Sequence, residues 1–140
     1  MTRVSGVLRQ QVIERANGCC EYCQAQQAIV IEMEVDHIIP ESKGGPTRLD
    51  NLCLACVTCN GFKLNFTEGL DPETDAAAPL FNPRLHTWSE HFRWHKGGTE
   101  LIGLTSVGRA TISRLNINRP LNRIARQNWV QAGWHPPKLD

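Results

Sequence analysis

An Asp-His pair and two asparagines carry the chemistry that this sequence offers. Adjacent residues near a strand end point in opposite directions, so one can hold a metal ion while the other addresses a water molecule. Asp36 offers a hard oxygen ligand suited to Mg²⁺ or Mn²⁺, and a neutral His37 imidazole can take a proton from water near pH 7. Asn60 offers an amide oxygen as a second ligand. Asn51 can orient His37 by accepting its other ring N–H.

Each of these residues also has an ordinary structural interpretation. An isolated Asp-His pair is more often part of a capped turn, and Asn51 directly follows Asp50, which is typical of a turn. Each signal is weak by itself, and the cysteines around these residues make the prediction stronger.

Two Cys-x-x-Cys pairs enclose this group of residues. Cys20 and Cys23 form the first pair, and a tight turn between two such thiolates aims both sulfurs at one tetrahedral ion. Cys53, Cys56 and Cys59 are spaced by threes, and we choose Cys56 with Cys59 because Leu52 and Leu54 indicate a short strand around Cys53. Two pairs predict a structural zinc ion, whereas a redox dithiol or buried free cysteines are the alternatives. The 32 residues between the pairs exceed the usual zinc-ribbon spacing, which indicates that the segment between them has a function of its own.

The order of the whole set resembles the HNH endonuclease family, in the form with two zinc knuckles. The resemblance covers about residues 15–66. The matching residues are Cys20, Cys23, Asp36-His37-Ile38-Ile39-Pro40, Gly44-Gly45, Asn51-Leu52, Cys56, Cys59, Asn60 and Lys63.

The resemblance implies a fold class and a set of roles. The fold would be α+β, with a ββα-metal (His-Me finger) core between two zinc knuckles. His37 would be the general base and Asn51 would position its ring. Asp36 and Asn60 would bind the catalytic ion, with Asn60 where the family name expects a second histidine. Lys63 would lie near the substrate phosphates, although a solvated helix lysine is an equal alternative.

Short elements must position these residues. The apolar spacing predicts a helix over residues 5–16, one or two strands within 28–39, and a loop over 40–50 that contains Pro40 and two glycines. A short helix is expected over residues 60–66. The acidic, turn-rich stretch 67–79 is the best boundary in the chain.

The C-terminal part reads as a hairpin followed by two helices. Alternating aromatic residues and Gly97-Gly98 predict a hairpin over residues 88–105. Helices are expected over 106–116 and 119–132, the second with Asn118 as its cap. Arg119, Arg123 and Arg126 fall on one side of that helix, where they could contact phosphates or form a solvated face. His86 or His91 could complete the metal site, but aromatic packing is the stronger interpretation.

Charge is distributed unevenly along a chain whose net charge is only +1. Residues 1–80 hold 6 Lys and Arg against 11 Asp and Glu, and residues 81–140 hold 9 against 3. A basic part beside an acidic metal-binding part suits a polyanion, while two complementary surfaces that pack together are the alternative. No apolar run approaches a membrane span, and the first ten residues lack the apolar core of a signal peptide, so we expect a cytoplasmic protein.

The combined prediction is an HNH endonuclease that hydrolyses DNA phosphodiester bonds with a divalent metal ion. We expect a nuclease domain over residues 1–66, a linker over 67–79, and a basic aromatic extension over 80–140 that packs on the nuclease domain. The expected cofactors are structural Zn²⁺ and catalytic Mg²⁺ or Mn²⁺. DNA is the expected partner, with RNA and the oligomeric state left open and no membrane involved. The competing hypothesis is a non-catalytic zinc module that binds nucleic acid or a protein.

Overall fold

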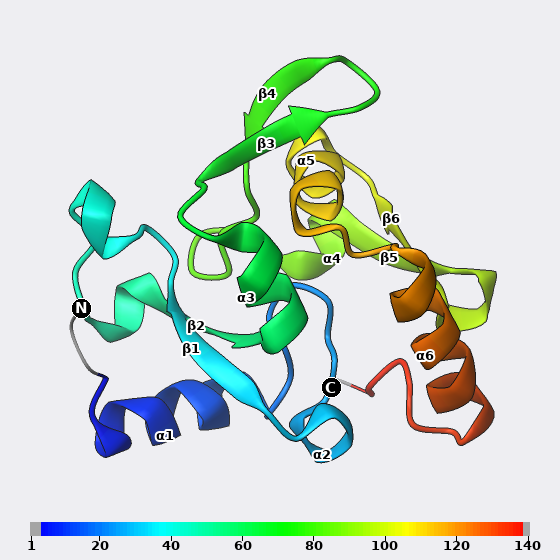
Figure 1. The fold of residues 1–140 in the computed structure, drawn as a ribbon, viewed down its shortest axis with the longest axis horizontal. Helices are drawn as coiled ribbons and strands as arrows, with labels where there is room; N and C mark the ends of the chain where they lie inside the picture. The colour runs from blue at the N-terminus through cyan, green and yellow to red at the C-terminus, as the bar shows by residue number, and fades with distance from the viewer. Residues whose placement is uncertain (1–3, 139–140) are drawn as a thin grey trace. The chain divides into compact units, whose positions relative to one another are not determined.

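A computed structural model describes residues 4–138 as two compact units. The first unit contains the chain up to Thr67 together with Asn82–His86, and the second contains Glu68–Phe81 and the chain from Thr87 onward. The outer ends of the predicted domains 1–66 and 80–140 lie outside the described residues. Each unit is a mixture of short helices and two-stranded sheets, so the predicted α+β class is confirmed at that level (Figure 1).

The first unit is built on one antiparallel hairpin. Its elements are α1 (Gly6–Arg15), α2 (Gln27–Val30), β1 (Met33–His37), β2 (Leu52–Cys56) and α3 (Val57–Lys63). In the β1–β2 ladder Met33 lies opposite Cys56 and His37 lies opposite Leu52. All five residues of β2 are buried. The helix α3 contacts both strands, so strand, strand and helix follow one another in the chain and pack together (Figure 1).

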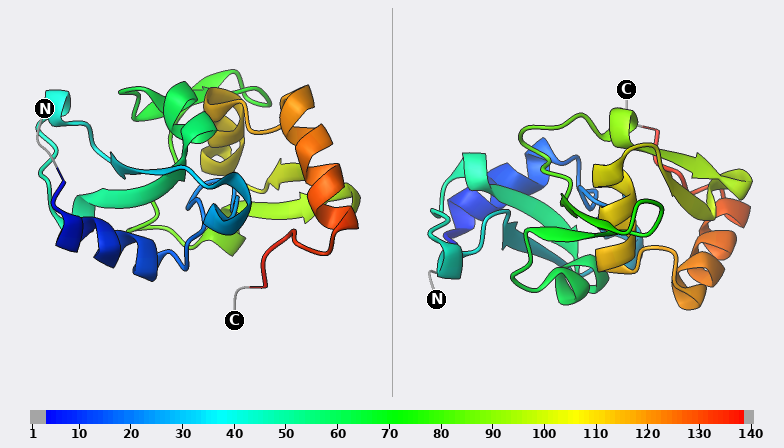
Figure 2. Two further views of the ribbon diagram at one scale, coloured as in Figure 1. Left: turned by 60° about the horizontal axis from the view of Figure 1, so that its bottom comes forward. Right: turned by 90° about the horizontal axis from the view of Figure 1, so that it is seen from above.

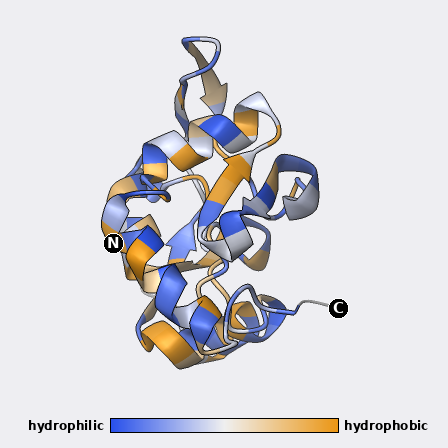
Figure 3. Cartoon of the chain, turned by 90° about the vertical axis from the view of Figure 1, so that its right-hand side faces the viewer, coloured by the Kyte–Doolittle hydropathy of each residue, from blue (hydrophilic) through white to orange (hydrophobic). Residues whose placement is uncertain are grey.

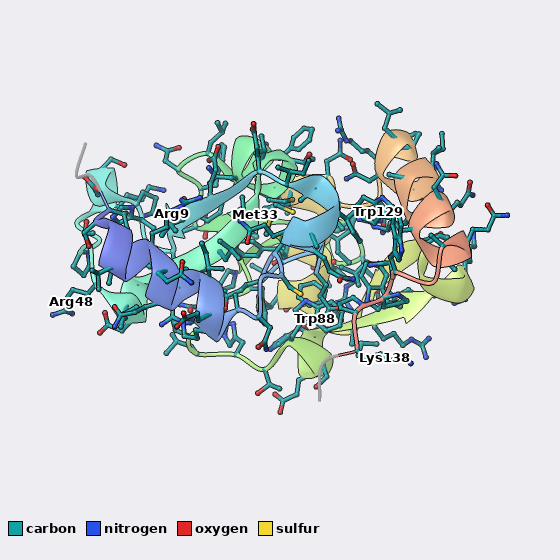
Figure 4. The ribbon with its side chains drawn as sticks, turned by 90° about the horizontal axis from the view of Figure 1, so that it is seen from below. Arg9, Met33, Arg48, Trp88, Trp129 and Lys138 are labelled. Carbon is teal, nitrogen blue, oxygen red and sulfur yellow. The ribbon has the colours of Figure 1, made fainter. Side chains whose placement is uncertain are left out.

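Local signals explain where α1 begins and ends. The side chain of Ser5 accepts a hydrogen bond from the Leu8 N–H, which caps the first turn. Asn17 and Gly18 then adopt left-handed conformations that stop the helix. The Arg9 guanidinium donates to the Met33 carbonyl at 2.9 Å and so ties α1 to the start of β1 (Figure 4).

Within residues 28–39, where one or two strands are predicted, only Met33–His37 forms a strand. Residues Gln27–Val30 form the single helical turn α2 instead. The Gln27 N–H donates to the Gly18 carbonyl, and this contact with a distant residue fixes the turn in spite of the β-branched composition.

The second unit contains two hairpins and two longer helices. Its strands are β3 (Glu68–Asp71), β4 (Ala76–Pro79), β5 (Phe92–His95) and β6 (Glu100–Gly103). Its helices are α4 (Trp88–His91), α5 (Ser106–Leu115) and α6 (Pro120–Gln131). Both hairpins contact α5, and Figure 2 shows the β3–β4 hairpin beside that helix.

The C-terminal predictions are met in outline. The predicted hairpin is β5–β6, preceded by a helical turn at Trp88–His91, and the two predicted helices are α5 and α6. Asn118 does not cap α6, because its side chain bonds both backbone groups of Leu101 and Arg119 occupies the cap position. The stretch 67–79, predicted as a linker, contains the β3–β4 hairpin, and its turn-forming residues lie mainly between the two strands.

The helices carry hydrophilic and hydrophobic residues together (Figure 3). Among the described residues, none of the helices is long and apolar enough to cross a membrane.

Candidate nuclease site

Four cysteine sulfurs meet in the first unit. Their Sγ atoms all lie within 4.8 Å of one another, and all four residues are buried: Cys20, Cys23, Cys56 and Cys59. A tetrahedral zinc ion with Zn–S bonds of about 2.3 Å requires sulfur atoms about 3.8 Å apart. The Cys23 and Cys56 sulfurs are 3.7 Å apart, so the cluster fits zinc. Burial raises the pKa of the Cys20 thiol, and a bound cation is the countercharge that thiolates there require.

The geometry also distinguishes the four clustered cysteines from the two other cysteines, Cys53 and Cys19. Cys56 caps α3, and its sulfur accepts the Cys59 N–H at 3.3 Å, which brings the second pair into one turn. Cys53 lies opposite Asp36 in the β1–β2 ladder, and its sulfur contacts the Tyr22 hydroxyl at 3.6 Å. The Cys19 thiol donates to the Asn17 carbonyl. These positions agree with the choice of Cys56 and Cys59 over Cys53.

His37 ends β1, and its ring is held by two residues of the following loop. The Nε2 atom lies 2.8 Å from Thr47 Oγ1 and 3.1 Å from Glu41 Oε1. The His37 side chain is 15% exposed, so solvent still reaches the ring. When Nε2–H donates to the Glu41 carboxylate, Nδ1 keeps the lone pair that can accept a proton.

Asn51 makes different bonds from those predicted. Its Oδ1 accepts the Ile39 N–H at 2.9 Å, and its Nδ2 donates to the Ile39 and Pro46 carbonyls at 3.0 and 2.9 Å. Asn51 therefore closes the loop after His37 through backbone groups, and Glu41 and Thr47 contact the His37 ring in its place. The sequence signal for Glu41 is weak, since it consists only of a carboxylate four residues after His37.

Asp36 faces α3 and pairs with Lys63. The Lys63 ammonium lies 2.9 Å from Asp36 Oδ2 and donates to the His37 carbonyl at 3.2 Å. Burial raises the pKa of Asp36, and the Lys63 charge opposes that rise. Lys63 is only 1% exposed, which argues against its predicted place beside the substrate phosphates.

Asn60 also faces β1, one turn before Lys63. Its Nδ2 donates to the Glu34 carboxylate, a partner that the sequence analysis missed. Glu34 and Asp36 lie two residues apart on one face of β1, and Asn60 and Lys63 lie three apart on α3. The two predicted ligands of the catalytic ion therefore belong to one β1–α3 interface. Carboxylate and amide oxygens are a donor set that suits Mg²⁺ or Mn²⁺.

The three arginines predicted to lie on one side of α6 differ in burial within the second unit. Arg126 is 3% exposed and donates to the Thr99 and Ile117 carbonyls, so it is not available to phosphates. Arg119 bonds the Asn122 side chain, and Arg123 is exposed. Arg126 is therefore removed from the predicted substrate contacts, while Arg119 and Arg123 stay predictions.

The two histidines considered as extra ligands have other partners. His86 Nδ1 accepts the Asn82 N–H at 2.9 Å in the first unit. His91 Nδ1 lies 2.6 Å from Thr105 Oγ1 in the second unit, where its ring also meets Phe81 edge-on.

Comparison with known proteins identifies the segment that holds this site. Residues 20–65 match the family model described as HNH endonuclease. The match begins at Cys20 and ends two residues after Lys63. No curated protein and no solved structure matches the chain. The members of this family are nucleases, so the match points to a nuclease-type function for the segment.

Proposed function

We propose that the first unit is a divalent-metal-dependent endonuclease with a ββα-metal core, in which His37 is the general base for hydrolysis of DNA. The observation that carries this proposal is the position of His37 at the end of β1. Its Nε2 is engaged by Glu41 and Thr47, and Asp36 is the preceding residue. The proposal is supported by the family match over the same residues.

The hydrolytic step follows from the ring geometry. Nδ1 of His37 takes a proton from a water molecule as the water oxygen forms a bond to phosphorus. The phosphorus bond to the 3′ oxygen breaks, and that oxygen receives a proton from solvent. Asp36 and Asn60 would hold the catalytic Mg²⁺ or Mn²⁺, which when bound neutralises charge on the phosphate. The Glu41 carboxylate stabilises the imidazolium that His37 becomes.

The four cysteines would have a separate, structural role. Zinc would join the turn at Cys20 to the first turn of α3 at Cys59. Asn60 follows directly, so its position would depend on the zinc site. A small unit with a modest core commonly needs such a metal ion for stability.

A cleavage assay with a matched histidine pair tests the proposal. His37→Ala should lower plasmid cleavage in Mg²⁺ or Mn²⁺ by roughly 10²–10⁴-fold, the usual contribution of a general base, and should keep its zinc. His95→Ala, at an exposed position of β5, should cleave as the unaltered protein does. Equal cleavage by His37→Ala would overturn the assignment. DNA binding without cleavage in any divalent metal would favour the non-catalytic zinc module.

A further inference from the structure

Two polar pairs join β1 to α3 at the nuclease site. Lys63 pairs with Asp36, and Asn60 donates to Glu34. In each pair one member is a proposed ligand of the catalytic ion and the other has no role in the proposed step. Glu34 and Lys63 are the two members without a role in the proposed step, and their contacts indicate what they do.

Lys63 holds both residues of the Asp36-His37 pair with one ammonium group. A buried ammonium needs close compensating partners, and Lys63 has the Asp36 carboxylate and the His37 carbonyl. Its contact is with Asp36 Oδ2, so the Oδ1 atom is the one left for a metal ion. A phosphate contact would require this buried pair to separate.

Glu34 fixes which way the Asn60 amide points. A primary amide presents an acceptor oxygen on one side and a donor nitrogen on the other. Because the Glu34 carboxylate accepts from Nδ2, the Oδ1 atom is directed away from Glu34 as the ligand. A rotated amide would present N–H groups to a cation. Glu34 is exposed and Asn60 half-buried, so this end of the interface is open to ions from solvent.

We propose that Glu34 and Lys63 are positioning residues that orient the ligand atoms of Asn60 and Asp36 for the catalytic ion. This inference rests on the proposed function, because it assigns roles at the same site. It also moves Lys63 from substrate contact to support of the site. Partners of this kind typically change metal affinity or activity by about 10–100-fold when they are removed.

The first test measures metal binding without DNA. Binding of Mn²⁺ to the full chain is measured by calorimetry for the unaltered protein, Glu34→Ala and the control Glu32→Ala, which changes an exposed glutamate just before β1. Glu34→Ala removes the acceptor for Asn60 and should weaken Mn²⁺ binding about 10–100-fold without changing the melting temperature. Glu32→Ala should leave both the Mn²⁺ affinity and the melting temperature unchanged. Equal Mn²⁺ affinity in all three proteins would overturn the role of Glu34.

The second test separates positioning from substrate contact at Lys63. Lys63→Met should lower kcat with little change in KM for DNA, and the exposed control Lys43→Met should change neither. A phosphate contact would instead raise KM and reduce the salt dependence of DNA binding by about one charge, which would overturn the positioning role. If Lys63→Met does not fold, the Glu34→Ala result decides the proposal alone.

These outcomes are distinct from failure of the nuclease proposal. Mn²⁺ binding that depends on Glu34 in a protein that cuts no DNA would overturn the nuclease function and keep this inference. Cleavage that is lost in His37→Ala but unchanged in Glu34→Ala and Lys63→Met would overturn this inference and keep the nuclease function. An unaltered protein that binds no Mn²⁺ would overturn both.

Discussion

Asn51 forms a closed pair of hydrogen bonds with the backbone of Ile39. Its side-chain oxygen accepts from the Ile39 N–H at 2.9 Å, and its amide nitrogen donates to the Ile39 carbonyl at 3.0 Å. The Asn51 side-chain amide thus makes the two hydrogen bonds that a neighbouring strand would make with a residue just beyond β1. Because Ile39 lies two residues after His37, this pair fixes the path of the chain that carries the proposed base.

We expect Asn51→Ala to unfold more easily and to lose cleavage. The change leaves one N–H and two carbonyls without their side-chain partner in a partly buried place, which should lower the free energy of unfolding by about 1–3 kcal/mol. Thermal melts and plasmid cleavage check this, with exposed Asn65→Ala as the control. Asn51→Asp should also lower stability and cleavage, because it places a carboxylate against the Ile39 and Pro46 carbonyls. Normal cleavage by either variant would refute the role given to Asn51.

Gly45 is required by the same loop for a steric reason. A Cβ atom at this position would lie 1.7 Å from the Ile39 carbonyl oxygen and 2.8 Å from Asn51 Nδ2. Gly45→Ala should therefore lower the free energy of unfolding by about 3 kcal/mol or more. Gly61→Ala is the matched control, since its Cβ would meet open space in α3 and should stabilise by about 0.5–1 kcal/mol. Denaturant unfolding of both variants checks the difference, and similar stabilities would show that the loop can relax.

The sequence predicted the cysteine cluster and the place of Asp36-His37 in β1, because those signals are local. Cysteine spacing predicts which sulfurs meet, and the Asp36-His37 pair falls at a strand end as expected. The partners of these residues come from elsewhere in the chain, so spacing alone does not reveal them. Glu34 is an ordinary strand residue in the sequence, and only the packing of α3 on β1 brings it to Asn60.

Helix α6 shows why burial is harder to predict than helix formation. The apolar residues Leu121 and Ile124 share one face of α6, yet they are 66% and 53% exposed. Arg126 is buried instead, because its guanidinium bonds carbonyl groups that the fold leaves without strand partners. A helical period defines which residues share a face, but long-range hydrogen bonds decide which face is covered.

Arg84 links a remote segment to the first unit, and its removal should destabilise that unit. Arg84 pairs with Glu21, whose other carboxylate oxygen accepts the Leu54 N–H at 2.8 Å. The two side chains are 15% and 13% exposed, so Arg84→Met leaves a poorly solvated charge. The expected loss is about 1–3 kcal/mol.

The control for Arg84 is another ion pair of the same unit. Arg48 and Asp50 pair at the surface with side chains 69% and 70% exposed, so Arg48→Met should cost less than about 1 kcal/mol. Release of zinc to a colorimetric chelator during denaturant unfolding reports on the first unit for both variants. Equal midpoints would mean that Asn82–His86 does not contribute to the stability of that unit.

The second unit should lose stability in mild acid because of His135. Its ring lies edge-on to Trp94 with centroids 4.5 Å apart and is 5% exposed. Burial, followed by the charge of Arg126, lowers the pKa of His135 to about 4. The unfolded chain takes up this proton near pH 6.5, so it binds more protons than the folded chain between pH 6.5 and 4. Stability should therefore fall as the pH is lowered through that range.

Replacement of His135 by phenylalanine isolates this contribution. His135→Phe keeps an aromatic ring beside Trp94 and removes the titrating group, so its melting temperature should fall less than that of the unaltered protein between pH 7 and pH 4.5. All 4 tryptophans lie between residues 88 and 134, so tryptophan fluorescence follows the second unit. His95→Phe, at an exposed position, should follow the unaltered protein. Parallel pH curves for His135→Phe and the unaltered protein would show that His135 takes up its proton equally in the folded and unfolded states.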